Sequence, residues 1–178
     1  MKQRPFRASV VYAISLFSVI VLVLLDQYAK WLAAVYLKGK ESISLISGVL
    51  ELKYLYPENK GIAFGMFQGN VVIFAVLTVI MAALIIYLFV KIPKTSYYMP
   101  LIVTAVMMLS GALGNLIDRT VRGYVIDFIY FSLIDFPIFN LADIYVVCSG
   151  ILLVFLVCFY YKEEEISVLF PSGKKNDK

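Results

Sequence analysis

The chain has 178 residues, 62% of them hydrophobic, and a formal net charge of +4. That hydrophobic share is well above the roughly 45–50% of a typical soluble domain, so the composition predicts an integral membrane protein. Lysines and arginines flank apolar runs instead of alternating with stacking aromatic side chains, which argues against a nucleic-acid partner. Histidine is absent, which excludes Ser-His and Cys-His nucleophile systems and zinc sites built on histidine.

Four apolar runs are long enough to cross a bilayer, and we expect a mainly α-helical protein with four transmembrane helices. The expected spans are residues 8–25, extending as a helix to 36, and residues 71–90, 99–117 and 141–161. The first run is longer than the apolar core of a secretory signal, and no small-x-small cleavage site follows it, so we interpret it as a span. The two cysteines, Cys148 and Cys158, lie inside the last run, where we expect them to act as small hydrophobic side chains.

Residues 39–70 are expected to form a small β-rich insert at the membrane surface, between the first two spans. Short alternating or β-branched patterns over 42–46 and 49–56 favour strands, and the segment 59–65 (NKGIAFG) has the Gly and Asn content of tight turns. In the third span, Ser110, Gly111, Ala112 and Gly114 form a small-residue face that permits close helix packing.

Four spans place both termini on one side of the membrane. The basic N-terminus and the loop containing Lys91 and Lys94 favour the cytoplasmic side, so the insert and the loop 118–140 are expected outside. We expect residues 1–162 to form one membrane domain and residues 163–178 to be a charged, poorly ordered cytoplasmic tail.

Polar residues gather at the expected outer ends of spans three and four. Asn115, Asp118 and Arg119 share one helical face, and Asn140 and Asp143 lie where span four begins. A structural alternative exists for each group: charges at a helix end in headgroup water, and ordinary helix N-capping. Ionisable residues next to membrane spans are nevertheless candidates for function.

Asp127 lies in the apolar sequence Val-Ile-Asp-Phe, where neither a charged helix end nor a helix N-cap explains it. An ordinary solvated loop position is the remaining structural alternative for Asp127. Asp135, beside a proline, is expected to be an ordinary turn residue. Asp26 and Lys30 are four residues apart, so an ion pair that anchors the first helix is available.

Folding the loop back would bring Asp127 and Asp143 together at one membrane face. Two close carboxylates share a proton and titrate as a pair, and such a pair can activate water and protonate a scissile carbonyl. As a hypothesis, the dipole of the fourth helix favours Asp143 as the carboxylate and leaves Asp127 as the acid.

The polar blocks resemble those of the lipoprotein signal peptidases (signal peptidase II), in the same order over about residues 20–160. The blocks are DQYAK at 26–30, NxGxAF at 59–64, GxxGNxxDR at 111–119, VxDF at 125–128 and FNxAD at 139–143. Each block alone is weak, but five in register are specific. Ile62 departs from the small residue that is more frequent there.

The resemblance implies an intramembrane aspartic endopeptidase in the bacterial inner membrane that cleaves diacylglyceryl-modified prolipoproteins before the lipidated cysteine. It implies Asp127 and Asp143 as the catalytic dyad and a β-cradle over 39–58, with 128–138 as a mobile outer loop. It further implies supporting or substrate-binding residues at Asp26, Lys30, Asn59, Gly61, Asn115, Asp118, Arg119 and Asn140. We expect no metal or organic cofactor, a monomer, and prolipoprotein and membrane lipids as the partners.

Three other classes are less consistent with the sequence. A proton-coupled transporter would distribute acidic groups through the membrane depth, whereas span two carries no charge. A phospholipid-synthesising phosphotransferase would carry a D-x-x-D-G-x-x-A-R run, which is absent. A non-catalytic assembly factor is separated from a peptidase only by the effect of substituting Asp127 or Asp143.

Overall fold

The computed structural model describes residues 5–59, 71–167 and 169. Four helices in this part of the chain are long and apolar enough to cross a membrane, as the sequence predicts. They are α1 (Ala8–Tyr36), α2 (Val71–Lys91), α3 (Met99–Val121) and α4 (Leu141–Phe155), the last continued by a π-helical segment η4 (Leu156–Tyr160). Large apolar side chains such as Phe17, Val72 and Ile151 are at least two-thirds exposed on this bundle, which is the outward face that a bilayer requires.

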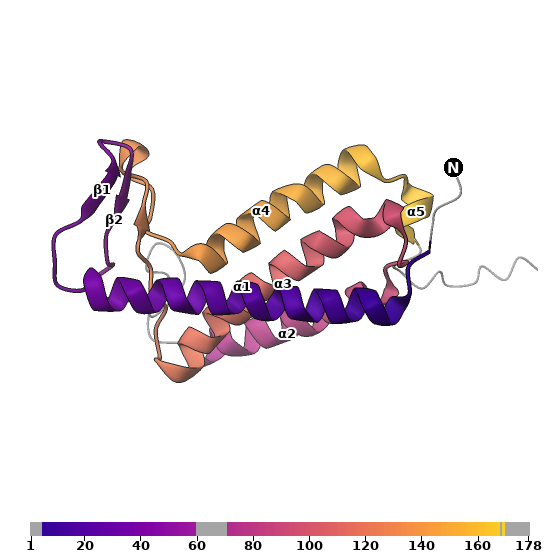
Figure 1. Cartoon of the computed structure of the whole chain (residues 1–178), viewed down its shortest axis with the longest axis horizontal. Helices are drawn as coiled ribbons and strands as arrows, with labels where there is room; N and C mark the ends of the chain where they lie inside the picture. Colours follow the sequence, from indigo (N-terminus) through magenta and orange to yellow (C-terminus); the bar gives the residue numbers. More distant parts are fainter. Residues whose placement is uncertain (1–4, 60–70, 168, 170–178) are drawn as a thin grey trace, which may run out of the picture.

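The two ends of the bundle differ (Figure 1). One end, here called the insert end, carries the strands β1 (Ile43–Ile46) and β2 (Leu50–Leu52) and the segment 122–140. The other, called the terminal end, carries the beginning of α1, the 3₁₀ turn η2 (Ser96–Tyr98) and the short helix α5 (Glu163–Ser167), and Pro5 pairs there with Thr95. Both termini of the described chain therefore lie at the same end, as an even number of spans requires.

The predicted insert is a β-sheet, but it includes a third strand that the sequence did not indicate. The antiparallel order is β1-β2-β3, where β3 (Ile129–Tyr130) comes from the connection between α3 and α4. Leu52 pairs with Ile43 on one side and Ile129 on the other. The 3₁₀ turn η3 (Ser132–Ile134) forms the tip of the same connection. The sheet therefore joins the insert to the segment that carries Asp127.

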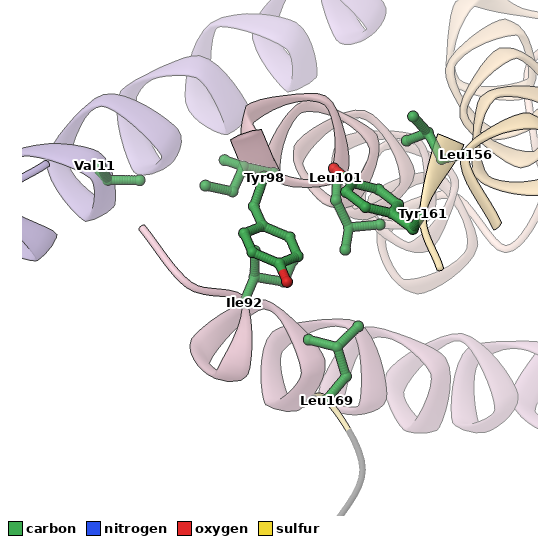
Figure 2. Close-up of a cluster of buried hydrophobic side chains, with 8 residues drawn as sticks. Val11, Ile92, Tyr98, Leu101, Leu156, Tyr161 and Leu169 are labelled. Carbon is green, nitrogen blue, oxygen red and sulfur yellow. The ribbon is translucent and has the colours of Figure 1, made fainter. Parts of the chain in front are cut away.

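Apolar clusters close both ends of the bundle. At the insert end, Ala33, Leu37 and Tyr54 pack with Ile126 and Phe128, which fixes the sheet on the end of α1. At the terminal end, the cluster of Figure 2 joins all four spans and the chain after α5; its members are Val11, Ile92, Tyr98, Leu101, Ile102, Leu156, Tyr161 and Leu169.

Two boundaries differ from the expectations. Helix α3 continues to Val121, four residues beyond the predicted end at 117, because Asp118 is neutralised and buried instead of solvated. The residues after Lys162 were expected to be poorly ordered, yet Glu163–Ser167 is helical and Glu165 accepts a hydrogen bond from the hydroxyl of Tyr97 at 2.8 Å. Leu169 is buried in the cluster of Figure 2, which gives this segment an apolar anchor.

Candidate active site

The N-terminus of α4 is closed by a capping box. The side-chain oxygen of Asn140 accepts from the backbone N–H of Asp143 at 3.1 Å, and Oδ2 of Asp143 accepts from the N–H of Asn140 at 3.1 Å. This reciprocal arrangement satisfies two backbone donors at the start of the helix, so both residues cap α4. Capping does not exhaust either side chain, because the Asn140 amide nitrogen and Oδ1 of Asp143 make further contacts.

Asp127 lies in an extended segment whose backbone is hydrogen-bonded to two other parts of the chain, at Leu55 and Phe139. Its carbonyl accepts from the N–H of Leu55 at 3.0 Å, and the N–H of Phe128 donates to the carbonyl of Phe139 at 3.0 Å. Side chains alternate along an extended segment, and Ile126 and Phe128 both pack into the apolar cluster at the insert end. Asp127 therefore points the other way, toward the N-terminus of α4.

The carboxylate of Asp127 is 3% exposed and accepts from two neutral amides. Nδ2 of Asn140 lies 2.6 Å from Oδ1, and Nδ2 of Asn59 lies 2.9 Å from Oδ2. Burial raises the pKa of Asp127 to about 6, because the charged form loses water, while the two amide hydrogen bonds oppose the rise. A carboxyl group in this condition can exchange a proton near neutral pH.

Asp143 and Asp127 meet through shared partners. Asn140 donates its amide to Asp127 and its backbone N–H to Asp143. Oδ1 of Asp143 accepts from Nδ2 of Asn115 at 2.8 Å. The fold thus brings the two acidic residues predicted as a pair to one site, Asp127 from the connection between α3 and α4 and Asp143 from the first turn of α4.

Behind the two carboxylates lies a buried ionic cluster of α1 and α3. The ammonium of Lys30 is 2.9 Å from Oδ2 of Asp26 and 3.0 Å from Oδ2 of Asp118, and all three side chains are fully buried. Asp118 also pairs with Arg122. With two acidic and two basic groups in contact, the cluster is neutral as a whole, which is what burial of charges demands.

Asn115 links the ionic cluster to the carboxylate pair. Its Oδ1 accepts from Lys30 at 3.0 Å and from Nδ2 of Asn140 at 3.2 Å, so its amide nitrogen is the group that faces Asp143. Lys30 therefore fixes the orientation of the amide instead of pairing with the catalytic candidates directly. Asp26 contributes in the same way, since its Oδ1 accepts from the N–H of Ala142 at 3.0 Å and holds the first turn of α4.

The small-residue face of α3 allows these contacts. A Cβ at Gly114 would lie 2.6 Å from Oδ2 of Asp26, and one at Gly111 would lie 2.7 Å from Cγ2 of Val146. Both distances are shorter than side chains tolerate, so glycine is required where α3 meets α1 and α4. The predicted role of this face in close helix packing is confirmed.

Most predicted site residues converge, with two qualifications. Arg119 donates to the carbonyl of Asn115 at 3.4 Å and forms no ion pair within the described chain, but it lies near enough to Asp143 and Asp127 to interact with them electrostatically. Gly61 lies outside the described residues, so its predicted role stays a prediction. Asp135 is exposed at the tip of the connection, with φ of 49° and the hydroxyl of Tyr130 at 2.6 Å from Oδ1, as expected of a turn residue.

Two side chains of the ionic cluster were not predicted. Gln27 donates to Oδ1 of Asp118 at 3.1 Å and accepts from Arg122 at 3.0 Å. Arg122 could have been found from its spacing, since it follows Asp118 by four residues on one helix. The only signal for Gln27 was its position inside the block DQYAK. Among the described residues, no three carboxylate or thiol groups are placed to hold a metal ion.

Comparisons with known proteins agree on one family. The model of the family described as Signal peptidase (SPase) II matches residues 18–159. The lipoprotein signal peptidase of Caldanaerobacter subterraneus subsp. tengcongensis is 44% identical over 138 residues, which are 77% of this chain and 90% of that protein. The lipoprotein signal peptidase of Fusobacterium nucleatum subsp. nucleatum is 35% identical over 153 residues, 86% of this chain and 91% of that protein. A bacterial membrane enzyme solved by the in meso method at 1.9 Å is 29% identical with a TM-score of 0.74, covering 90% of this chain and 99% of that one.

Proposed function

The chain belongs to the signal peptidase II family, and we propose that it cleaves diacylglyceryl-modified prolipoproteins before the lipidated cysteine, with Asp127 and Asp143 as its acid–base pair. Family membership makes it a peptidase of a multi-pass membrane class. The substrate is inferred from relatives that are named lipoprotein signal peptidases. The assignment of the two aspartates is inferred from the geometry of the site.

One observation carries the assignment: Asn140 binds both carboxylates at once. Its side-chain amide donates to Asp127 at 2.6 Å, and its backbone N–H donates to Asp143 at 3.1 Å. The hydrogen bonds described for the two carboxylates come from neutral amides, while the cation Lys30 is occupied by Asp26 and Asp118. Within the described residues neither carboxylate forms a direct ion pair, and two neighbouring carboxylates in that condition are favoured to share one proton.

A shared proton supplies both halves of peptide hydrolysis. Asp143 lies in the first turn of α4 and accepts from Asn115 and from a backbone N–H, which favours its ionised form as the base. Asp127, whose pKa is raised to about 6 by burial, is the member that holds the proton as the acid. Asp143 takes a proton from water as the oxygen attacks the scissile carbonyl carbon, and Asp127 gives its proton to the carbonyl oxygen.

Collapse of the tetrahedral intermediate completes the reaction. The carbonyl re-forms as the C–N bond breaks, and the proton held by Asp143 passes to the leaving nitrogen. The hydroxyl proton of the intermediate returns to Asp127. The pair is thereby restored with one proton, and no metal or organic cofactor takes part in the scheme.

The location of the pair fits a substrate anchored in the bilayer. Both carboxylates lie at the insert end, where α3 ends and α4 begins, so we propose that this end faces the outside of the cytoplasmic membrane. Basic side chains at the terminal end, Arg7, Lys91 and Lys94, agree with cytoplasmic termini. A helical signal peptide would then present its cleavage point beside the dyad.

The test is cleavage of a diacylglyceryl-modified prolipoprotein by the full chain purified in detergent, with the cut located by mass spectrometry. We expect a cut before the lipidated cysteine, slow or no cleavage of the unmodified precursor, and no detectable cleavage by Asp127→Asn or Asp143→Asn. An inactive parent on a verified substrate would overturn the peptidase proposal in favour of a transporter or assembly factor. Cleavage by both aspartate variants at the parent rate would overturn the dyad.

A further inference from the structure

A lateral groove lies between α1 and α3 at the terminal end, far from the carboxylate pair. It has a volume of about 610 Å³ and is lined by residues of 6–22 and 99–107, named below the α1–α3 groove. Its floor is buried and includes Val11, Ser15 and Ile102, while rim residues such as Phe17 and Val103 are exposed. Its volume falls within the roughly 300–1,000 Å³ typical of small-molecule sites.

The groove forms where α1 and α3 meet only at its floor, with Val11 of α1 in one buried cluster with Leu101 and Ile102 of α3. At the insert end, Lys30 of α1 pairs with Asp118 of α3, and Gly114 admits Asp26 to the α3 surface. Toward the terminal end, α3 diverges from α1 (Figure 1), and the residues facing the space include the small side chains Ser15 and Ser18. The side chains therefore leave the apolar α1–α3 groove open on the outer surface of the bundle, where a membrane protein contacts lipid.

The length of the groove corresponds to one leaflet. From Arg7 to Leu22 the axis of α1 rises about 22 Å, at about 1.5 Å per residue. Half of a bilayer of about 40–45 Å, headgroups included, is about 20–22 Å. A single acyl chain with its headgroup would fill this length, with the headgroup at Arg7.

The charge at the mouth indicates which headgroup. Arg7 lines the groove and is exposed, and no hydrogen bond or ion pair to its guanidinium occurs within the described residues. The neighbouring basic residue Lys94 is occupied, because its ammonium donates to the carbonyls of Phe89 and Ile92, each at 2.6 Å. Among the described basic residues around the groove, Arg7 is thus the one available to a phosphate, for which a guanidinium has matching donors.

We propose that the α1–α3 groove binds one anionic glycerophospholipid, with an acyl chain against Val11, Ser15 and Ile102 and its phosphate at Arg7. The lipid fills the space where α1 and α3 do not pack and comes from the leaflet at the terminal end. This inference does not depend on the proposed peptidase mechanism, since it uses neither the aspartates nor the insert.

Native mass spectrometry of the full chain tests the headgroup, with dioleoylphosphatidylglycerol and dioleoylphosphatidylcholine as the probes. The parent is expected to retain one phosphatidylglycerol and to bind phosphatidylcholine about fivefold more weakly, the factor that one basic side chain contributes near an anionic lipid. Arg7→Gln should abolish this preference. Lys91→Gln is the matched control, because Lys91 lies at the same end over the ring of Tyr87 and outside the groove. Equal loss in both variants, or no headgroup preference in the parent, would overturn the proposal.

A second pair of variants tests the apolar part. Ser18→Phe places a ring in the groove and should lower phosphatidylglycerol retention at least fivefold, whereas Leu84→Phe, on the exposed face of α2, should leave it unchanged. Retention by Ser18→Phe at the parent level would overturn the groove as the site. A dimer of the parent that Ser18→Phe converts to monomer would assign the groove to a second copy instead. A raised KM for prolipoprotein with unchanged lipid retention would assign it to the substrate helix.

Discussion

At Gly111 the backbone of α3 packs so closely against α4 that a side chain would clash with it. Gly111→Ala is therefore the most informative perturbation of the fold around the site. A Cβ built there lies 2.7 Å from Cγ2 of Val146 and 3.2 Å from its backbone nitrogen, and it also meets the carbonyl oxygen of Ala142. Carbon atoms pack at about 3.5–4.0 Å, so α4 has to move by about 1 Å. Because Ala142 directly precedes Asp143 and Val146 lies on the next turn of the same helix, the movement of α4 displaces the carboxylate.

The expected magnitude follows from that displacement. A 1 Å misplacement of a catalytic group costs about 100-fold in rate, and the hydrogen bond of 2.8 Å between Asn115 and Asp143 would be stretched beyond its useful length. Overpacking of a well-packed interface costs about 1–3 kcal/mol of stability. We therefore expect kcat/KM on diacylglyceryl prolipoprotein to fall about 100-fold, while the folded protein persists with a lowered Tm.

Gly150→Ala is the matched control for this experiment. It lies on the same helix α4, and a Cβ there meets nothing within 4 Å. Alanine is the better helix former, so Tm should be unchanged or slightly raised and kcat/KM should stay within about twofold of the parent. Parent-like activity of Gly111→Ala, measured beside this control, would refute the view that close α3–α4 packing sets the position of Asp143.

Three further predictions concern the polar network. Lys30→Met leaves Asp26 and Asp118 buried without their cation, and loss of one partner of a buried pair costs about 3–5 kcal/mol, so Tm should fall by roughly 10 °C. The control Lys38→Met removes an exposed pair with Glu58 and should leave Tm nearly unchanged; equal Tm values for the two variants would contradict the stabilising role of the buried ionic cluster. Asp127 holds its proton below its pKa of about 6 and loses it above, so kcat/KM should decline as the pH rises through about 6. Asn59→Ala removes a hydrogen bond that favours the charged form of Asp127, so it should move this decline to higher pH. A shift to lower pH would contradict the assignment of Asp127 as the acid. Asn140→Ser keeps a good N-cap but loses the amide contact to Asp127, so activity should fall roughly 10- to 100-fold while Tm stays within a few degrees. If activity and Tm fell together, Asn140 would serve only as a helix cap.

The spans and the small-residue face could be predicted because they depend on local pattern. Uninterrupted apolar runs of about 20 residues have one dominant solution in a membrane, and α1, α2 and α4 begin where the sequence indicated. The pair of Asp26 and Lys30 followed from helical spacing and is confirmed at 2.9 Å. Helix capping by Asn140 and Asp143 was one of the alternatives that their place at a helix start left open, and the structure shows it as a reciprocal capping box.

The features that escaped prediction depend on contacts distant in sequence. Strand β3 has only two residues, Ile129 and Tyr130, and is defined by pairing with β2 more than seventy residues earlier. The extension of α3 through Asp118 required knowing that Lys30 of α1 would neutralise it. The α5 segment reads as charged, and only its contact through Glu165 with Tyr97 and the burial of Leu169 give it a fixed place.

In the proposed mechanism Asp127 and Asp143 act as one chemical unit. The cleavage rates of Asp127→Asn, Asp143→Asn and the double variant, measured under one set of conditions, test this directly. Asp135→Asn is the control, since Asp135 is an exposed carboxylate in the same connection. If the two act together, each single variant and the double variant lose activity to the same residual level, because removing either member disables the pair, while Asp135→Asn cleaves at the parent rate. Losses that multiply in the double variant, or parent-like cleavage by either single variant, would show that the two aspartates do not act as a pair.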